Sequence, residues 1–308
     1  MTHQPVLLDQ VVASMAVTPE GLYIDATFGR GGHSLGLLQK LDSSASLLAV
    51  DRDEEAIFAA EVLAAADSRV RVARGDFGDL SVLLEQNFPA ASGTVMGVMM
   101  DLGVSSPQLD EAKRGFSFLN EGPLDMRMDT RSQPTAEAWL KEASIEEMAQ
   151  VFRELGEEKY SRRIALAIDT QRRIRSLSTT ADLVQIILSA QPRKERNKHG
   201  ATRVFQAIRM HINRELEQLE MGLGQAFELL APGGRLAVLS FHSLEDRLVK
   251  RTFRRWIQGD PLPRRLPVTG NPSGKARSVV RRLRATPEEV AANARARSAT
   301  LRVIEKVA

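Results

Sequence analysis

Three aspartates, Asp25, Asp51 and Asp101, each directly follow an apolar run of three or four residues. Such runs are typical of buried strands, and in an open parallel sheet ligands bind at the carboxyl ends of the strands. We therefore expect the three carboxylates to converge on one crevice. Carboxylates accept hydrogen bonds from hydroxyl groups and attract positive charge. The crevice would suit a small ligand that has hydroxyl groups and a positive charge, and S-adenosylmethionine has both.

A glycine-rich segment, Gly29-Arg-Gly-Gly-His33, follows the first of these aspartates. Glycine lets the backbone approach a ligand closely, but Ser34 stands where the dinucleotide fingerprint has its third glycine. Asp51 comes 22 residues after Gly29, at a strand end where a carboxylate can accept hydrogen bonds from both ribose hydroxyls. Two alternatives remain open, namely a tight turn without a ligand, and Asp51 as the N-cap of a helix that starts near Asp53.

The third aspartate begins a segment that could hold an amine for methyl transfer. Asp101 is followed by Ser105-Ser106-Pro107, and the proline restricts Ser106 to extended conformations. Fixed oxygen acceptors for the two hydrogens of an aryl amine would localise its lone pair toward an incoming methyl group, and in-line approach supplies much of the remaining rate. We therefore take Asp101, Ser105, Ser106 and Pro107 as candidate catalytic residues. The alternative is an ordinary turn from a strand into a loop.

Phe241 and His242 follow another apolar run, at residues 235–240. Phe241 could stack on a target base, an interaction worth about 1–3 kcal/mol, and His242 could contact the substrate. Alternatively, Ser243 and Asp246 form a helix cap and Phe241 belongs to the core. The five histidines of the chain show no metal-ligand spacing, so we expect no metal site.

The elements that must position these residues alternate between strands and helices. In the first hundred residues, strands are predicted near 22–27, 46–50, 69–73 and 94–100, and helices near 33–41, 53–66 and 78–88. Later in the chain the same pattern predicts a long helix over 204–230, a strand at 235–240, a helix at 243–257 and strands near 278–284 and 300–307. Such alternation favours an α/β fold with a parallel sheet.

Residues 106–200 interrupt this alternation. They contain no convincing strand, and helices are predicted near 135–143, 145–154, 157–174 and 180–190. Ser144 with Glu147 forms a capping box before the second of these helices. We therefore predict one domain built from residues 1–105 and 201–308, with residues 106–200 inserted into it as a helical domain.

Composition narrows the class of protein. The chain has 308 residues, of which 43% are hydrophobic, so it can bury a sizeable core. It has no cysteine, which excludes a disulfide framework and a cysteine nucleophile. No apolar run approaches the roughly 20 residues of a membrane helix, and no secretory core follows the polar N-terminus. We expect a soluble cytoplasmic protein without a membrane partner, which could form a homodimer.

The charge is unevenly distributed, although the formal net charge is only +3. Residues 1–160 contain 13 Lys/Arg and 26 Asp/Glu, whereas residues 247–302 contain 15 Lys/Arg and 3 Asp/Glu. Arginine dominates the basic segment, and its forked guanidinium favours recognition of phosphate. The segment is therefore a candidate nucleic-acid surface, with a solubilising surface as the alternative.

Several strings of the sequence carry a resemblance that runs from about residue 3 to residue 306. The strings are Pro5–Asp9, Tyr23–Ser34, Asp51–Asp53, Met100–Asp110, Arg114–Phe118, Gly122–Asp129, Ala201–Arg209, Ser240–Arg247 and Ala296–Arg302. Together they resemble the bacterial 16S ribosomal RNA (cytosine-N4)-methyltransferases, the RsmH/MraW family. This resemblance implies a class I methyltransferase (Rossmann-like) sheet interrupted by an inserted all-helical domain that recognises the substrate.

The same resemblance implies a cofactor, a substrate and a set of contacts. The cofactor would be S-adenosyl-L-methionine, and the substrate would be N4 of a cytidine in the decoding region of 16S rRNA, as naked RNA or in the small ribosomal subunit. The implied cofactor contacts are Gly31, Gly32 and His33 at the methionine part, Asp51 at the ribose, Phe77 at the adenine, and Asp101 and Gln108 at the rest of the pocket.

Two other functions stay in competition. One is a non-catalytic ribosome-assembly factor that retains the cofactor fold. The other is an NAD-dependent dehydrogenase, against which the missing third glycine at Ser34 and the Ser105-Ser106-Pro107 turn both argue.

Overall fold

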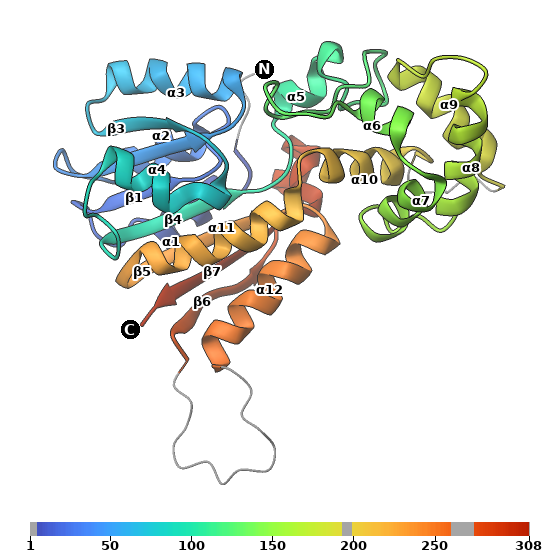
Figure 1. The fold of residues 1–308 in the computed structure, drawn as a ribbon. Coiled ribbons are helices and arrows are strands. Elements are labelled where there is room, and N and C mark those ends of the chain that lie inside the picture. The colour runs from blue at the N-terminus through green and yellow to red at the C-terminus, as the bar shows by residue number, and fades with distance from the viewer. Residues whose placement is uncertain (1–4, 193–198, 260–273, 308) are drawn as a thin grey trace, which may run out of the picture. The chain divides into compact units, whose positions relative to one another are not determined.

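The structure, a computed structural model, describes residues 5–192, 199–259 and 274–307, apart from the side chain of Ser106. The chain forms two compact units, one from Met1–Gly103 with Leu216–Ala308 and one from Val104–Glu215 (Figure 1). The second junction lies at Glu215, not at the residue 200 that the sequence indicated. The reason is that the helix over Thr202–Ile212 packs on helices of the inserted unit.

The first unit is built on a seven-stranded sheet with the order β3-β2-β1-β4-β5-β7-β6. Strands β1 to β5 are parallel, and β7 runs antiparallel to both β5 and β6. The strands are β1 (Leu22–Asp25), β2 (Ser46–Asp51), β3 (Val70–Arg74), β4 (Val95–Asp101), β5 (Leu230–Ser240), β6 (Ala276–Leu283) and β7 (Thr300–Lys306). All seven strands predicted from the sequence are present. The strand order reverses between β1 and β4, which is where open α/β sheets bind ligands.

Helices cover both faces of this sheet because successive strand residues point to opposite faces. Tyr23 and Ile24, for example, lie in different apolar clusters. The cluster of Tyr23 includes residues of α1 and α2, and that of Ile24 includes residues of α4, α11 and α12. The helices are α1 (Leu8–Met15), α2 (Gly32–Leu38), α3 (Glu54–Ala66), α4 (Leu80–Asn87), α11 (Glu215–Leu229), α12 (Ser243–Gln258) and α13 (Pro287–Ala292), with 3-10 turns at Phe77–Asp79 and Ala294–Ser298.

The inserted unit is helical and has its own core. Phe152, Ile164 and Ile187 are fully buried in it. Ser144 caps α7 as predicted, because its hydroxyl accepts from Glu147 N at 3.1 Å. The helices are α5 (Ser106–Asp110), α6 (Ala136–Glu142), α7 (Ile145–Glu154), α8 (Ser161–Arg172), α9 (Thr180–Ala190) and α10 (Thr202–Ile212), with a 3-10 turn at Ala112–Arg114.

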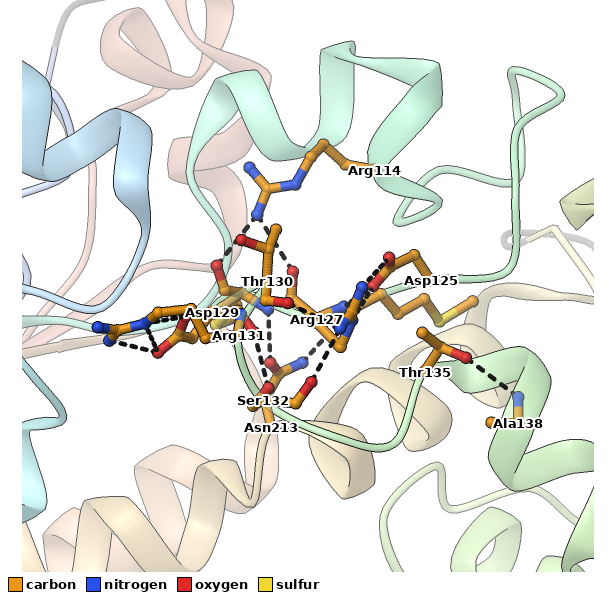
Figure 2. Close-up of polar contacts among 12 residues, drawn as sticks. Arg114, Asp125, Arg127, Asp129, Thr130, Arg131, Ser132, Thr135, Ala138 and Asn213 are labelled. Carbon is orange, nitrogen blue, oxygen red and sulfur yellow. Dashed lines mark hydrogen bonds and ion pairs between the residues drawn. The ribbon is translucent and has the colours of Figure 1, made fainter.

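The single helix predicted over 204–230 was wrong, since the chain breaks between α10 and α11. The buried Asn213 side chain donates to Met126 O at 2.7 Å and accepts from Met128 N at 2.7 Å (Figure 2). Arg214 then adopts a left-handed φ of 49°. The apolar periodicity continues through the break, but the contacts of Asn213 with a distant loop interrupt the helix.

Arginine side chains brace the loop that Asn213 holds, and Arg114 donates to Arg127 O and Met128 O, both at 3.1 Å. Arg127 donates from Nε to Asp125 Oδ1 at 2.7 Å and from Nη1 to the carbonyl oxygens of Thr130 and Ser132, both at 2.8 Å (Figure 2). The guanidinium thereby fixes the path of the chain leading into α6.

Candidate functional site

The glycine-rich segment crosses the point where the strand order reverses and is tied to both neighbouring strands. Ala26 N donates to Met99 O of β4 at 2.9 Å, and Phe28 N donates to Val50 O of β2 at 3.0 Å. Gly31 has φ of 73°, and a Cβ there would lie 2.5 Å from the Phe28 ring. The segment therefore needs glycine at this position to follow its path.

Asp51 holds the same segment from the end of β2. Its Oδ2 accepts from Gly29 N at 2.8 Å and its Oδ1 accepts from Asp53 N at 2.9 Å. The alternative of Asp51 as a helix cap is wrong, because Asp53 caps α3 by accepting from Glu55 N at 3.0 Å. Burial raises the pKa of Asp51. Each carboxylate oxygen has a second lone pair, so Asp51 retains acceptor capacity for a ligand hydroxyl.

Asp25, in contrast, does not face a crevice. Its side chain is only 1% exposed and accepts from Ser34 Oγ at 2.6 Å and from Thr27 N at 3.2 Å. Burial raises its pKa to about 6. Asp25 therefore supports the turn instead of facing a ligand, and the convergence of Asp51 and Asp101 on one crevice stays a prediction.

Asp101 and His33 meet at the end of β4. His33 Nε2 donates to Val6 O at 2.9 Å, which leaves Nδ1 without a proton in the neutral ring, and Nδ1 lies 3.7 Å from Asp101 Oδ2. Burial lowers the pKa of His33. Burial, followed by the charge of Glu245, raises the pKa of Asp101 to about 7. The structure thus pairs a neutral imidazole with a carboxyl group that titrates near neutrality.

One oxygen of Asp101 remains available. Among the described residues, its Oδ1 is buried and has no hydrogen-bond partner, although the side chain as a whole is 30% exposed. Thr27 Oγ1 accepts from Asp101 N at 2.6 Å and so fixes the backbone at this point. A buried acceptor without a donor is destabilising, and a ligand N–H or O–H would satisfy it.

The residues after β5 form a helix cap different from the predicted one. His242, and not Ser243, is the N-cap of α12, and its ring accepts from Glu245 N at 3.5 Å. Glu245 Oε2 accepts in turn from Phe241 N at 2.8 Å and from His242 N at 3.2 Å. Phe241 is partly buried against the core, and a Cβ on Gly103 would contact its ring at 3.9 Å. Phe241 therefore lies beside the chain leaving β4, and its stacking on a base stays a prediction.

Phe77 opens the 3-10 turn after β3. A Cβ on Gly222 of α11 would lie 2.6 Å from its ring, so that helix packs tightly on Phe77. Next to it, Arg52 donates to Asp76 Oδ1 at 2.9 Å and joins the ends of β2 and β3. The contact of Phe77 with adenine stays a prediction.

Ser105 to Gln108 belong to the inserted unit, and their local conformation differs from the predicted one. Ser105 is the extended N-cap residue, and Ser106 begins α5 where an extended residue was expected. Pro107 is tolerated in the first turn, because N–H groups there have no helical partner. Gln108 Oε1 accepts from Ser105 N at 2.9 Å and completes a capping box. The Ser106 side chain lies outside the described part of the structure.

The structure therefore brings together two sets of predicted residues in the sheet unit. Gly29 lies with Asp51, and His33 lies with Asp101. Sequence reasoning missed Thr27 and Glu245 as their supports. The sequence signal for Glu245 is its position three residues after His242, which is the spacing of a capping box. The prediction of Ser243 as the cap residue paired it with Asp246 and so passed over Glu245.

A family model and the sequence relatives of this chain indicate one family. The model of the MraW methylase family matches residues 1–307. A protein of Shewanella pealeana named ribosomal RNA small subunit methyltransferase H is 50% identical over 99% of this chain and 97% of its own length. The protein of the same name from Shewanella oneidensis is 49% identical with the same coverage. An rRNA methylase structure from Streptococcus thermophilus has a TM-score of 0.42 and 10% identity, covering 100% of this chain and 99% of its own.

None of the helices in the described part of the chain is long and apolar enough to cross a membrane. The seven-stranded sheet, with its antiparallel β7 and its helical insertion between β4 and β5, is the Rossmann-like class I arrangement that the resemblance implied. Because the family model covers nearly the whole sequence and the relatives are about half identical along their length, the chain belongs to the MraW methylase family.

Proposed function

We propose that this protein transfers a methyl group from S-adenosyl-L-methionine to the exocyclic N4 amine of a cytidine in the decoding region of 16S ribosomal RNA. Family membership and the name of the Shewanella relatives support an activity on ribosomal RNA. The observation that carries the chemistry is the buried Oδ1 of Asp101, an acceptor without a donor among the described residues at the end of β4.

We assign most of the cofactor contacts to the sheet unit. In this proposal Gly31, Gly32 and His33 lie against the methionine part, where added Cβ atoms would collide with Phe28 and Pro5. The remaining assignments are Asp51 to the ribose hydroxyls, Phe77 to the adenine, and Asp101 and Gln108 to the rest of the pocket. When bound, the cofactor supplies an electrophilic methyl group on a positively charged sulfur.

Asp101 would hold the acceptor amine. Its ionised carboxylate accepts an N–H of the amine and so directs the nitrogen lone pair toward the methyl group. The amine nitrogen held by Asp101 would take the methyl group, and the sulfur would keep the electron pair of the bond that breaks. The nitrogen then carries an extra proton, which leaves to Asp101 or to water. Ser105, Ser106 and Pro107 would supply the acceptor for the second amine hydrogen.

The RNA must present the base outside its stack, since enzymes that modify a base act on an extruded or single-stranded nucleotide. The inserted helical unit would recognise the surrounding RNA, either naked or in the assembled subunit. A cytoplasmic location follows from this substrate. Whether two copies associate stays a prediction from the sequence.

To test this, the protein is incubated with tritiated S-adenosyl-L-methionine and one of three substrates: small ribosomal subunits, naked 16S rRNA or single-stranded DNA. The nucleic acid is then digested and the labelled nucleoside is identified. We expect label on N4-methylcytidine from ribosomal RNA. Label on DNA alone, or on a carbon atom of the base, would contradict the proposal. Binding of rRNA without any transfer would favour a non-catalytic assembly factor.

A further inference from the structure

One face of α12 carries only positive charge. Its exposed charged side chains after the first turn are all basic and recur at spacings of three and four residues, which places them on one face of the helix. They are Arg247, Lys250, Arg251, Arg254 and Arg255. The opposite face is apolar and buried, through Leu248, Val249 and Phe253.

This helix is fixed firmly to the sheet. Arg302 of β7 is 7% exposed and donates to both carboxylate oxygens of Asp246, at 2.7 and 3.1 Å. Near the other end of the helix, Trp256 stacks on Phe227 with ring centroids 4.3 Å apart. The cationic side chains are therefore presented by a rigid element of the sheet unit.

The neighbouring edge strand extends the positive surface. Helix α12 packs against β6, which has a strand neighbour only on the β7 side (Figure 1). Around β6 the exposed charged side chains are again all basic, namely Lys275, Arg277, Arg281, Arg282 and Arg284. We use the name basic face for the five residues on α12 together with these five, although neighbours along β6 such as Arg281 and Arg282 point to opposite sides of the strand. The described segments 247–259 and 274–287 contain no acidic residue.

Two acids outside these segments touch the basic face. Glu305 lies 2.5 Å from Arg277, and Glu220 lies 3.8 Å from Arg251. These two ion pairs leave the described segments of the basic face with an excess of positive charge.

Protection of a sheet edge does not account for this surface. Charged side chains on β6 would by themselves discourage pairing with another strand, but α12 is not an edge. On α12, Arg247 with Arg251, Lys250 with Arg254, and Arg251 with Arg255 are like charges four residues apart, which repel. A helix face exposed only to water usually mixes signs, so the single sign indicates a polyanionic partner.

We propose that the basic face binds the phosphate backbone of the RNA strand that continues from the target cytidine. The choice of RNA rests on the proposed function. Helix α12 begins two residues after Phe241, at the carboxyl end of β5, and the stretch from Arg247 to Arg255 adds about 12 Å at 1.5 Å per residue. Guanidinium groups bind phosphate oxygens in pairs. A membrane surface fits less well, because the apolar face that would enter lipid is buried in the core.

The test compares two triple variants of α12. In K250Q/R251Q/R255Q three charges are removed, and in the control K250R/R251K/R255K all three are kept. The probe is a fluorescein-labelled single-stranded RNA, titrated by anisotropy at several salt concentrations. The slope of log K against log salt should fall by about 2 for the neutral variant, at about 0.7 per phosphate contact. The same relation gives about a 50-fold weaker affinity at 0.15 M salt.

Other outcomes would overturn the proposal. The proposal is wrong if the neutral variant keeps the salt slope of the unmodified protein. It is also wrong if the control binds RNA as weakly as the neutral variant, because charge would then not be responsible. Binding to phosphatidylserine vesicles in place of RNA would assign the face to a membrane. Thermal unfolding checks the fold, and at low salt the neutral variant should melt slightly higher because repulsion is removed. RNA binding without methyl transfer by the unmodified protein would refute the proposed function and leave this inference intact.

Discussion

The pH dependence of methyl transfer offers a sharp test of Asp101. An aspartate with its ordinary pKa of 3.8 is fully ionised throughout the working range of an enzyme, whereas burial and Glu245 raise the pKa of Asp101 to about 7. If the ionised carboxylate holds the amine, kcat/KM should follow its titration. At pH 6 about one tenth of the groups are ionised, so kcat/KM should be about tenfold below its plateau.

Titration of His33 does not account for a change in kcat/KM near pH 7, because burial lowers the pKa of His33 and keeps its ring neutral at that pH. The variant Glu245→Gln removes a negative charge that opposes ionisation of Asp101, so the midpoint of the profile should move to lower pH. Asp246→Asn is the matched control, because it removes a charge from the same helix that is paired with Arg302. Its midpoint should stay near that of the unmodified protein.

The assay is tritium transfer to small subunits at limiting RNA between pH 5.5 and pH 9. The variant Asp101→Asn keeps the shape of the side chain but loses the charge, and it should reduce kcat by about 100-fold and lose the inflection near pH 7. A flat profile for the unmodified protein, or an inflection that survives in Asp101→Asn, would remove Asp101 from the step.

Three further substitutions test the loop and the break between α10 and α11. Gly31→Ala should lower the free energy of unfolding in urea by about 2 kcal/mol, because of its positive φ and the Phe28 ring, and should weaken cofactor binding in calorimetry. Asp25→Asn removes a carboxyl whose folded-state pKa of about 6 lies above its ordinary value of 3.8, so ionisation of Asp25 opposes folding. The native protein should therefore lose about 2.5 kcal/mol relative to the variant between pH 4 and pH 8, most of it between pH 4 and pH 6, with little further change above that. A constant difference would contradict that reading of Asp25. Asn213→Ala removes the side-chain partner of two buried backbone groups in the 126–128 loop and should cost about 3 kcal/mol in urea unfolding, whereas a loss under 1 kcal/mol would mean that water replaces the side chain.

The strands and most helices could be predicted because their signal is local. Period-two alternation and apolar runs mark β1 to β4 within five residues or so, and Ser144 marks the start of α7. The continuous helix over 204–230 failed for the opposite reason. The contacts of Asn213 with Met126 and Met128 span more than eighty residues, and no periodicity within the helix reports them.

The site divides in the same way. The sequence predicts where each strand ends, so Asp51 and Asp101 could be chosen as candidate site residues. The direction in which a side chain points depends on its contacts in the folded protein, which the sequence does not report. Ser34 draws Asp25 inward, which an apolar run followed by an aspartate does not reveal. The shift of the cap from Ser243 to His242 likewise depends on the buried Glu245, whose burial is a tertiary property.

The placement of the insertion has a consequence for how the chain acquires its fold during synthesis. Strand β4 ends at Asp101, and its partner β5 begins at Leu230, about 130 residues later. During translation, β4 leaves the ribosome before β5 is made, so one edge of β4 has no partner strand. At typical elongation rates this delay lasts at least several seconds. The helical unit forms mainly local contacts and can fold in that interval. Nascent chains stalled near residue 215 should therefore contain a folded insertion beside an incomplete, aggregation-prone sheet.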